Sequence, residues 1–578
     1  MKRSGGNNRA NGVLAVLASL ALVLTTGACG MQSTGQTRAT PTTTKVSDPG
    51  NVAIFTPSDG ITLSQHTPLN KWAALVPELK DGLAKHHIDG KRVTTFTDSS
   101  LDDQSKDLQD YVVSHLAGGN KRGKAVSPTT LVIAPFTSPD SITRQYGDYV
   151  TQPQIKTGHD GSSAQDTSTG DSPETGFSGT GSPTTDSSDE ETTKKPSSKS
   201  SSDKEEGESK SYDRLVSSLK LAKEAGMHVV LLANDIPELS PDLFVDMSNA
   251  RSIGEFQATK LASKLELDKA SKDNPVRIEV LLPRRPADEE TTGTQQARND
   301  RETNQETNSF PRQAFAGIWQ VLGPYFKDGR AVSPSGLLTK ETTDKDWMAV
   351  TFDPGKDASA TKKEVAARLH MDSQSRTHTA VDGILAMNDF IVSGVVSELG
   401  DLGYTGSAAD INPEISISGI VGSITGKHDL HRKKVPKPAQ GEAPRQDADP
   451  TQPDQGASPQ STSKDGTRAK SDDNADHSAW PIISGYGAYV DNIPQIVDGE
   501  QWMTAIEDRK GLAADIAAVC ENLNKDGTLP GNLPAVGQET LSGRKVNRLT
   551  RPQVAVSASN LKSTLIDTNY IKPAEAGL

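Results

Sequence analysis

Residues of the types that carry catalytic or metal chemistry are few and scattered in this sequence. His428 and His431 could form a metal pair, but no third ligand accompanies them. His86 and His87 are adjacent, so they would not face one another on a helix. Cys520 falls on the apolar side of a predicted helix and is expected to be buried. Since no glycine-rich phosphate loop, G-x-S-x-G or H-E-x-x-H motif occurs, we expect no enzymatic activity, cofactor or metal.

Strand-like and helix-like segments alternate along the chain. The short apolar runs expected as strands are 52–56, 93–96, 131–135, 228–233, 276–282, 347–352, 383–386 and 481–484. The segments expected as helices are 69–84, 101–116, 212–226, 253–265, 315–326, 360–369, 391–402, 490–498 and 511–524. This alternation is typical of parallel sheets covered on both faces. We therefore predict an α/β protein with two doubly wound lobes, a class in which ligands bind outside the carboxyl ends of the strands.

The composition indicates ordered lobes diluted by long polar segments. Of 578 residues, 33% are hydrophobic, and 62 Lys and Arg stand against 75 Asp and Glu, a net charge of −13. Residues 153–210, 286–308 and 432–478 have almost nothing to bury and are expected to be disordered inserts. An acidic chain lacks the basic face that nucleic-acid binding needs. Two cysteines exclude a disulfide framework.

The N-terminus has the form of a secretion signal. Basic residues precede the apolar run 13–24, which is too short to span a hydrocarbon core comfortably. The small residues before Cys29 resemble the lipobox of bacterial lipoproteins, although Thr26 departs from its commonest form. We expect a signal peptide over 1–28, a lipidated Cys29 and a tether over 29–50; an ordinary cleaved signal is the alternative. The mature protein is then extracytoplasmic and held to the membrane by lipid alone.

Five segments carry a family likeness, in this order along the chain: KEAGMHVVLLAND (223–235), SNARSIGEFQATKLASKL (248–265), and the segments 382–403, 482–523 and 549–571. Together they resemble the type I periplasmic-binding fold, and most of all the xylose- and ribose-type monosaccharide-binding proteins of ABC importers. The resemblance implies two lobes joined by a hinge that the chain crosses three times, near residues 248, 503 and 546. The implied divisions are an N-terminal lobe over 51–248, a C-terminal lobe over 249–503, a return over 504–545 and a crossing segment over 546–578.

The resemblance also implies ligand contacts. Monosaccharide pockets place aromatic rings on the sugar's apolar face and satisfy its hydroxyls with polar side chains. Trp72 and Phe352 stand where the family often carries an aromatic, although Trp72 also suits a helix core and Phe352 a plain turn. Asn388 and Asp389 match the family's Asn-Asp pair, whose aspartate commonly binds a sugar hydroxyl. Both residues also suit the N-cap of the helix 391–402.

Several positions depart from the family's pattern. Asn234 and Asp235 stand where the family usually has Asp-Arg, and Asn249 lies in a stretch that has lost an acid. Tyr486 lies between two glycines where the family has Gly-Gln-Asp, so a principal carboxylate is absent. Tyr486 could instead stack on a ligand or close the pocket. With an arginine and two carboxylates lost, the site could suit another polar solute, or it could be vestigial.

The resemblance implies a monomeric binding protein that captures a small polar solute, a sugar above all, and presents it to an ABC permease. Closure of the two lobes around the ligand by hinge motion would create the form that the permease meets. The alternative is a surface sensor or scaffold that keeps the fold but has lost transport. The long charged inserts and the lost polar positions favour that alternative.

Overall fold

The computed structural model describes residues 48–59, 67–119, 127–137, 142–151, 201–285, 309–369, 378–408, 478–533 and 535–576. The predicted signal peptide, Cys29 and all but the last three residues of the predicted tether lie outside these ranges. The same holds for the predicted insert 286–308, and for 432–478 except its last residue.

Of the predicted insert 153–210, the structure describes only residues 201–210. For these ten residues the expectation of disorder was wrong, because they are helical. Helix α3 (Ser201–Glu224) begins there. Glu and Lys have high helix propensity, and Lys210 forms an ion pair with Glu206 one turn earlier, at 2.7 Å. A low apolar content therefore did not prevent helix formation in this segment.

The first sheet has seven strands in the order β12-β13-β5-β4-β3-β1-β2. Its strands are β1 (Asn51–Pro57), β2 (Val93–Asp98), β3 (Thr129–Ile133), β4 (His228–Leu232), β5 (Leu243–Asp246), β12 (Val536–Leu541) and β13 (Arg544–Thr550). All neighbours are parallel except the hairpin β12–β13. The predicted doubly wound arrangement is confirmed for this lobe.

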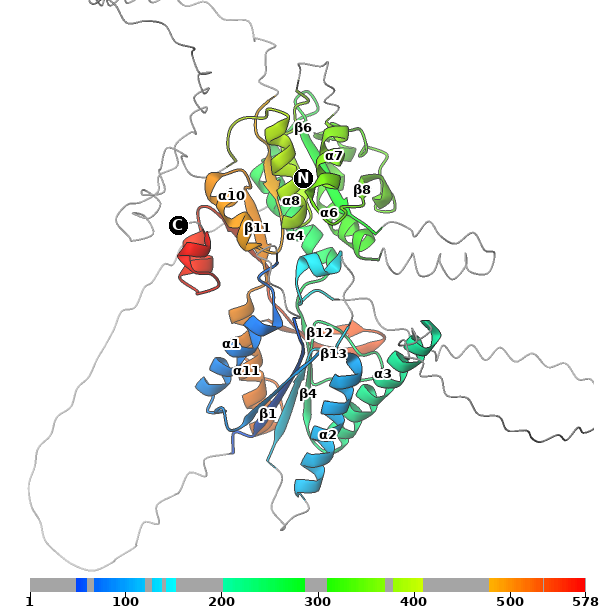
Figure 1. The fold of residues 1–578 in the computed structure, drawn as a ribbon, viewed down its shortest axis with the longest axis vertical. Coiled ribbons are helices and arrows are strands. Elements are labelled where there is room, and N and C mark those ends of the chain that lie inside the picture. Colours follow the sequence, from blue (N-terminus) through cyan, green and yellow to red (C-terminus); the bar gives the residue numbers. More distant parts are fainter. Residues whose placement is uncertain are drawn as a thin grey trace, which may run out of the picture. The chain divides into compact units, whose positions relative to one another are not determined.

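Helices cover both faces of the first sheet. Val52 and Ile54 pack with α1 (Trp72–Lys85) and α11 (Arg509–Asp526), and the alternate residue Phe55 packs with α3 and α2 (Leu101–Gly119). This alternation follows from the two-residue period of a strand. Figure 1 shows α1 and α11 on one side of the strands and α2 and α3 on the other.

The second sheet has the order β14-β11-β10-β9-β6-β7, with β8 also paired to β6. Its strands are β6 (Val276–Pro283), β7 (Ala331–Val332), β8 (Thr351–Phe352), β9 (Gly383–Ala386), β10 (Ile482–Ser484), β11 (Met503–Ile506) and β14 (Val554–Ser557). Its helices are α4 (Ala250–Lys264), α6 (Ser309–Lys327), α7 (Ala358–Arg368), α8 (Asp389–Asp401) and α10 (Ile493–Asp498). Helices α4 and α6 share one core with this sheet, and α7 and α8 share another.

The predicted strand 347–352 was wrong over most of its length. Residues Trp347–Val350 form a 3₁₀ turn, and only Thr351 and Phe352 pair with β6. The Val350 carbonyl accepts a hydrogen bond from the buried Arg368 guanidinium at 2.9 Å, so this backbone group is satisfied outside a ladder.

The chain passes between the two sheets three times. The crossings are the links from β5 to α4, from β11 to α11 and from β13 to β14. They fall at 247–249, 507–508 and 551–553. The second and third come later than the resemblance implied, because β11 still pairs with β14 up to Ile506 and β13 still pairs with β5 up to Thr550.

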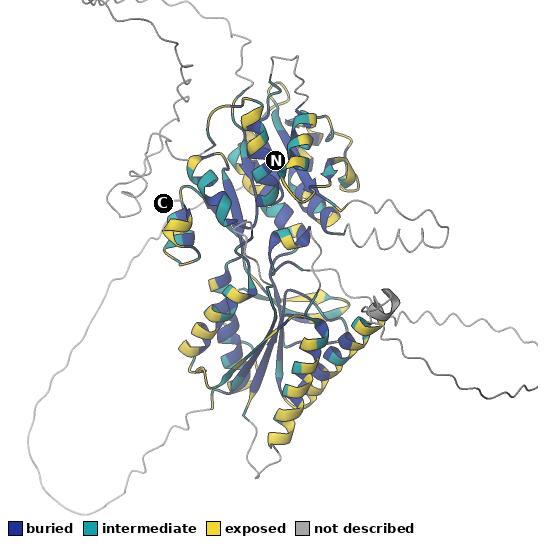
Figure 2. Cartoon of the chain, viewed as in Figure 1, coloured by how far each residue is buried: buried dark blue, intermediate teal, exposed yellow. Residues whose placement is uncertain are grey.

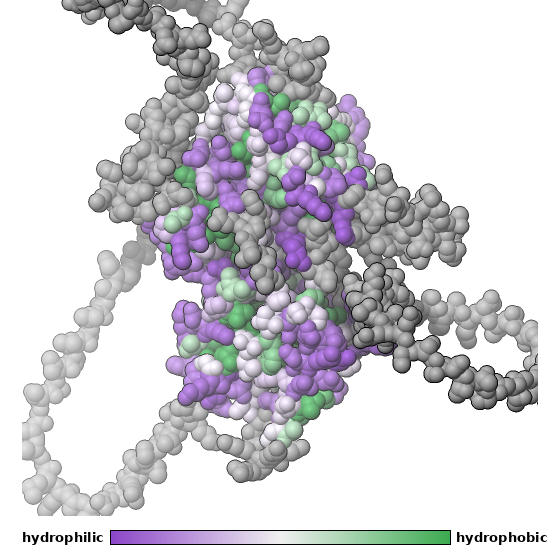
Figure 3. All heavy atoms as spheres, viewed as in Figure 1, coloured by the Kyte–Doolittle hydropathy of each residue, from purple (hydrophilic) through white to green (hydrophobic). Residues whose placement is uncertain are grey.

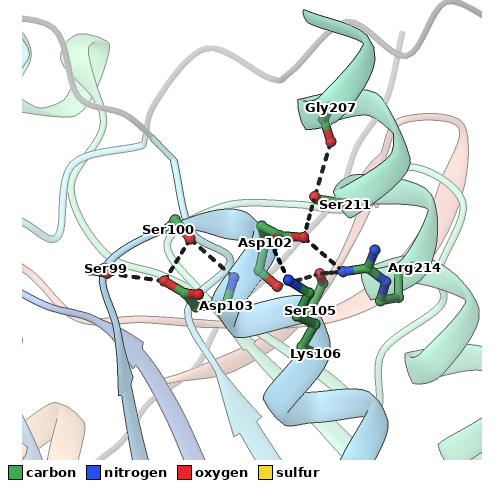
Figure 4. Close-up of polar contacts among 9 residues, drawn as sticks. All are labelled: Ser99, Ser100, Asp102, Asp103, Ser105, Lys106, Gly207, Ser211 and Arg214. Atoms are coloured by element: carbon green, nitrogen blue, oxygen red, sulfur yellow. Dashed lines mark hydrogen bonds and ion pairs between the residues drawn. The ribbon is translucent and has the colours of Figure 1, made fainter. Parts of the chain in front are cut away.

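Polar contacts join α2 to α3 (Figure 4). Asp102 accepts hydrogen bonds from Lys106 at 2.5 Å, from Arg214 at 2.9 Å and from Ser211 at 3.2 Å. These donors, Lys106 foremost, lower the pKa of Asp102 to about 2. The carboxylate is therefore ionised at neutral pH and links the two helices.

Burial follows the layers: the strands and the inner faces of the helices are buried, and the outer faces are exposed (Figure 2). The visible surface is mainly hydrophilic, with small apolar areas (Figure 3). Within the described ranges, no helix combines the length and the apolar character needed to cross a membrane.

Candidate ligand-binding site

A cavity of about 320 Å³ lies at the carboxyl ends of β1, β2, β3 and β4. The start of α1 and the segment around the 3₁₀ turn η1 (Thr143–Tyr146) complete its wall. Its lining residues are Pro57, Ser58, Asp59, Trp72, Ser99, Pro135, Phe136, Thr137, Arg144, Gly147, Asp148 and Asn234. This is the edge at which parallel α/β sheets bind ligands, and the volume is in the range of small-molecule sites.

Two aromatic side chains, Trp72 and Phe136, supply the large apolar surfaces of the cavity. Trp72 is only 4% exposed and packs against Tyr149, with ring centroids 5.0 Å apart. The wall and core roles considered for Trp72 are thus compatible, since its ring both anchors α1 and borders the cavity.

Two carboxyl groups, Asp59 and Asp148, face each other in the cavity wall. Asp59 accepts a hydrogen bond from the backbone N–H of Ala73 at 3.0 Å, and Asp148 accepts one from the N–H of Trp72 at 3.2 Å. Both therefore satisfy free donors at the N-terminus of α1. Burial, together with the hydrogen bond and negative charge of Asp148, raises the pKa of Asp59 to about 7. Near neutral pH, Asp59 can therefore both donate and accept hydrogen bonds.

Replacing Asp59 with Asn is expected to change the pH dependence of stability. The folded-state pKa of about 7 lies above the ordinary value of 3.8, so the native state holds a proton that the unfolded chain releases. Stability is therefore lost as pH rises from about 4 to 7. The neutral Asn mimics protonated Asp59, so Asp59→Asn should approach the wild type near pH 4. Its advantage should grow up to about pH 7 and reach about 1–2 kcal/mol, the carboxyl being partly solvent-screened.

Urea unfolding of both proteins across this pH range measures the effect. Asp89→Asn, at an exposed position of the same lobe, is the matched control and should track the wild type. Equal stability of Asp59→Asn and wild type at every pH would show that folding does not raise the pKa of Asp59.

The structure brings two of the residues expected to bind ligand, Trp72 and Asn234, to this cavity. Asp235, next to Asn234, points elsewhere: it forms an ion pair with Arg544 at 2.6 Å and accepts a hydrogen bond from Ser542 at 2.9 Å. These contacts hold the loop after β4 to the β12–β13 hairpin.

Two further residues that were expected to bind ligand, Asn249 and Phe352, have structural roles away from this cavity. Asn249 caps α4 by accepting a hydrogen bond from Ser252 N–H at 2.9 Å, and it lines a different cavity, of about 580 Å³, beside the first and third crossings. Phe352 ends β8 and is buried among Leu281 and Val365. Neither residue lines the cavity of Asp59 and Asp148.

Asn388 acts as the N-cap of α8 and accepts a hydrogen bond from Ile391 N–H at 3.0 Å. Of its two predicted roles, ligand contact and N-cap, the structure confirms the N-cap. Its amide also donates to Gln145 Oε1 at 3.0 Å. Asp389 is completely buried and accepts hydrogen bonds from Gln501, at 2.9 Å, and Thr504, at 2.8 Å. The contacts of Asp389 therefore lie within the protein interior.

Tyr486 is also completely buried. Its hydroxyl accepts a hydrogen bond from the Asn70 amide at 3.1 Å and lies 2.5 Å from Ser248 Oγ. The tyrosine stands at the crossings between the sheets and does not line the cavity.

The segment around η1 connects the cavity with the second lobe. It carries Arg144 and Asp148 in the cavity wall, while Tyr146 between them packs on Phe310, with centroids 4.4 Å apart. The backbone carbonyl of Gln145 accepts a hydrogen bond from Tyr489 at 2.8 Å. A molecule that contacts Arg144 or Asp148 would therefore touch a segment packed on the other lobe.

The lining residues that were not predicted from the sequence include Asp59, Phe136, Arg144 and Asp148. Asp59 and Phe136 follow β1 and β3 closely, so the rule that ligands bind outside the carboxyl ends of the strands could have found them. Arg144 and Asp148 lie well beyond β3, and only the packing of η1 returns them to the site.

The described residues contain no group of three or more His, Cys, Asp or Glu side chains placed to hold a metal ion. His86 lies 2.5 Å from Glu521, and His428 and His431 fall outside the described residues. Cys520 is fully buried, and burial raises the pKa of its thiol to about 12. It is an apolar core residue, as predicted.

No protein-family model and no curated protein matches this sequence. Solved structures resemble it at low identity. A solute-binding protein of an ABC transporter from Clostridium phytofermentans with bound β-D-glucose is 15% identical, covering 91% of this chain and 99% of its own, at a TM-score of 0.41. A carbohydrate transporter solute-binding protein from Chloroflexus aurantiacus in complex with D-glucose is 15% identical, with 91% of this chain and 97% of its own covered, at a TM-score of 0.40. An arabinose-binding protein from Geobacillus stearothermophilus is 10% identical, with 90% of this chain and 100% of its own covered, at a TM-score of 0.38.

Proposed function

We propose that this chain binds a small polar solute, with sugars and polyols the best-fitting class, in the cavity of Asp59 and Asp148. The observation that carries the proposal is the composition of that cavity. It combines two aromatic side chains with a carboxyl pair, an amide and a guanidinium at the ligand-binding edge of a parallel sheet.

Each kind of side chain has a counterpart on a sugar. The faces of Trp72 and Phe136 suit the apolar C–H surface of a pyranose or polyol. Asp59 and Asp148 accept hydrogen bonds from hydroxyls, and Arg144 donates to hydroxyl oxygens. A buried hydroxyl without a partner costs about 1–3 kcal/mol, so a cavity lined by donors and acceptors selects polar solutes over apolar ones.

The proposal extends to delivery of the solute to an ABC permease by a lipoprotein anchored at Cys29. This step rests on the sequence resemblance to importer binding proteins and on the residues before Cys29. Lipid attachment and a monomeric state need their own tests: labelling of the cells with a fatty-acid probe, with Cys29→Ala as control, and sedimentation of the compact unit from Asp48.

A second candidate, a sensor or scaffold that no longer transports, is favoured by one specific observation. Asp389 and Tyr486, two of the residues expected to meet a ligand, are fully buried and bonded within the protein. The polar groups remaining for a ligand then come mainly from the first lobe.

A thermal-shift screen of the compact unit that begins at Asp48 tests binding. Monosaccharides, polyols and nucleosides are the probes, and a ligand at 100 times its Kd should add about 2.7 kcal/mol of stability. Arg144→Ala should lose the ligand-induced rise in melting temperature. Its melting temperature without ligand should equal that of the wild type, because Arg144 is exposed. Arg312→Ala, at an exposed position on α6, should keep the ligand-induced rise. A cooperative melt with no shift for any probe would favour the sensor or scaffold.

A further inference from the structure

Three ionisable side chains line the cavity at the carboxyl ends of β1 to β4: Asp59, Arg144 and Asp148. Asp148 already has a cationic partner, since its Oδ1 lies 3.5 Å from Lys71 Nζ and both side chains are largely buried. Its other oxygen accepts a hydrogen bond from the N–H of Trp72 at 3.2 Å. The negative charge of Asp148 is therefore compensated within the protein.

The positive charge of Arg144 is not compensated in this way. Arg144 lines the cavity and is exposed, and among the residues that the structure describes it forms no ion pair. A guanidinium presents a planar set of donors that can hold a carboxylate through two parallel hydrogen bonds. The unpaired charge in the cavity wall is thus that of a cation suited to a carboxylate.

The N-terminus of α1, at the same cavity, has no donor left for an anion. Of its first four N–H groups, two donate to the carboxyls of Asp59 and Asp148, and the next two donate to the carbonyl of Lys71. These contacts satisfy the groups that a helix start leaves free. An anionic ligand would therefore find its partner in Arg144 and not in the helix.

Asp59 does not oppose an anion, because it is largely protonated below neutral pH. Burial raises its pKa to about 7, as do the hydrogen bond and the charge of Asp148, whereas the Ala73 N–H and the charge of Lys71 act in the opposite direction. Two carboxyls in the wall therefore contribute about one negative charge, and Lys71 compensates it.

The other charged groups near this end of the sheet add no free negative charge. Arg509 is paired with Glu78 at 2.9 Å. Asp98, at the end of β2, is buried, and burial together with the carboxyls of α2 raises its pKa to about 7. Asp389 of the second lobe is completely buried and accepts hydrogen bonds from the protein's own donors.

We propose that the cavity takes an acidic monosaccharide, a uronate or an aldonate, whose carboxylate pairs with Arg144 while its hydroxyls meet Asp59 and Asp148. This inference rests on the proposed function, since it narrows the class of solute for the same cavity. Charge-assisted hydrogen bonds are about twice as strong as neutral ones. Arg144 therefore favours the acid over a neutral sugar of the same size.

Capture of the acid should be accompanied by proton uptake. The bound carboxylate brings a negative charge into the cavity that Asp59 lines, and a nearby like charge favours the protonated form of Asp59. The complex then holds more protons than the free protein near neutral pH, so affinity falls as pH rises above about 7, by up to about tenfold per pH unit. The ligand's own carboxyl is ionised above about pH 5 and does not titrate in this range.

Isothermal titration calorimetry of the compact unit that begins at Asp48 tests the preference with matched pairs: D-glucuronate against D-glucose, and D-gluconate against D-glucitol. At pH 6 each acid should bind at least about tenfold more tightly than its neutral partner. Arg144→Gln keeps hydrogen-bond donors without the charge and should abolish this preference, whereas Arg144→Lys should keep part of it. Arg312→Gln, at an exposed position on α6, should behave like the wild type.

The same titrations at pH 7, in buffers of different ionisation enthalpy, count the protons taken up. Glucuronate should take up as much as about half a proton with the wild type and none with Asp59→Asn. Equal affinities within both pairs, or a preference for the acids that survives in Arg144→Gln, would overturn this inference and leave the solute-binding proposal standing. If neither the acids nor the neutral sugars bind, both proposals fail, so the two failures are distinguishable.

Discussion

Asp389→Ala is expected to lower the free energy of unfolding by about 4 kcal/mol. The carboxylate is completely buried and accepts hydrogen bonds from Gln501 Nε2 at 2.9 Å, Thr504 Oγ1 at 2.8 Å and Tyr489 N–H at 3.0 Å. Truncation leaves these donors without their acceptor inside the protein, and each buried unsatisfied group costs about 1–3 kcal/mol. The loop after β10 and the start of α8 should loosen together.

Urea unfolding at pH 7.5 measures the loss. The matched control is Asp401→Ala at the other end of α8, where the carboxylate is largely exposed and pairs with Lys362 at 2.5 Å. A surface pair of this kind contributes at most about 1 kcal/mol. A loss of less than about 1 kcal/mol for Asp389→Ala would mean that this carboxyl is not needed by the fold, and its predicted role in ligand contact would regain support.

Gly317→Ala is expected to cost about 3 kcal/mol, because it adds a methyl group where α4 and α6 touch. A Cβ at Gly317 would lie 2.1 Å from the Arg251 carbonyl oxygen, and a Cβ at Gly254 would lie 2.2 Å from the Ala314 carbonyl oxygen. Both obstacles are backbone, so the helices themselves must separate. Overpacking of a tight core usually costs about 1–3 kcal/mol, and a backbone collision belongs at the upper end.

The same substitution at Gly400, in the last turn of α8, should have the opposite sign. Apart from its chain neighbours and the backbone of its own helix turn, no atom lies within 4 Å of a Cβ built at Gly400. Replacing a helical glycine with alanine reduces the entropy of the unfolded chain and should stabilise by about 0.5–1 kcal/mol. Equal effects of Gly317→Ala and Gly400→Ala on the urea midpoint would contradict the close approach of α4 and α6.

Hydrophobic periodicity along the sequence predicted the alternation of strands and helices, but not β5 or β11–β14. Runs such as 228–233 and 383–386 became β4 and β9, because short runs of β-branched and aliphatic residues between helical segments favour buried parallel strands. The N-cap role of Asn388 was also visible, since capping involves residues only three positions apart. Gly254 and Gly317 show the limit of such local reasoning: within a helix they look unfavourable, and only their packing explains them.

The chemical roles of the polar residues depended on the tertiary structure. The sequence placed Asn234 and Asp389 alike after strands, yet Asn234 borders the cavity and Asp389 is fully buried among Gln501 and Thr504. Sequence spacing determines which strand end a residue occupies, whereas burial depends on which distant segments pack over that end. The cavity around Asp59 and Asp148 and the contact between Ser248 and Glu507 were therefore decided only when segments distant in the sequence came together.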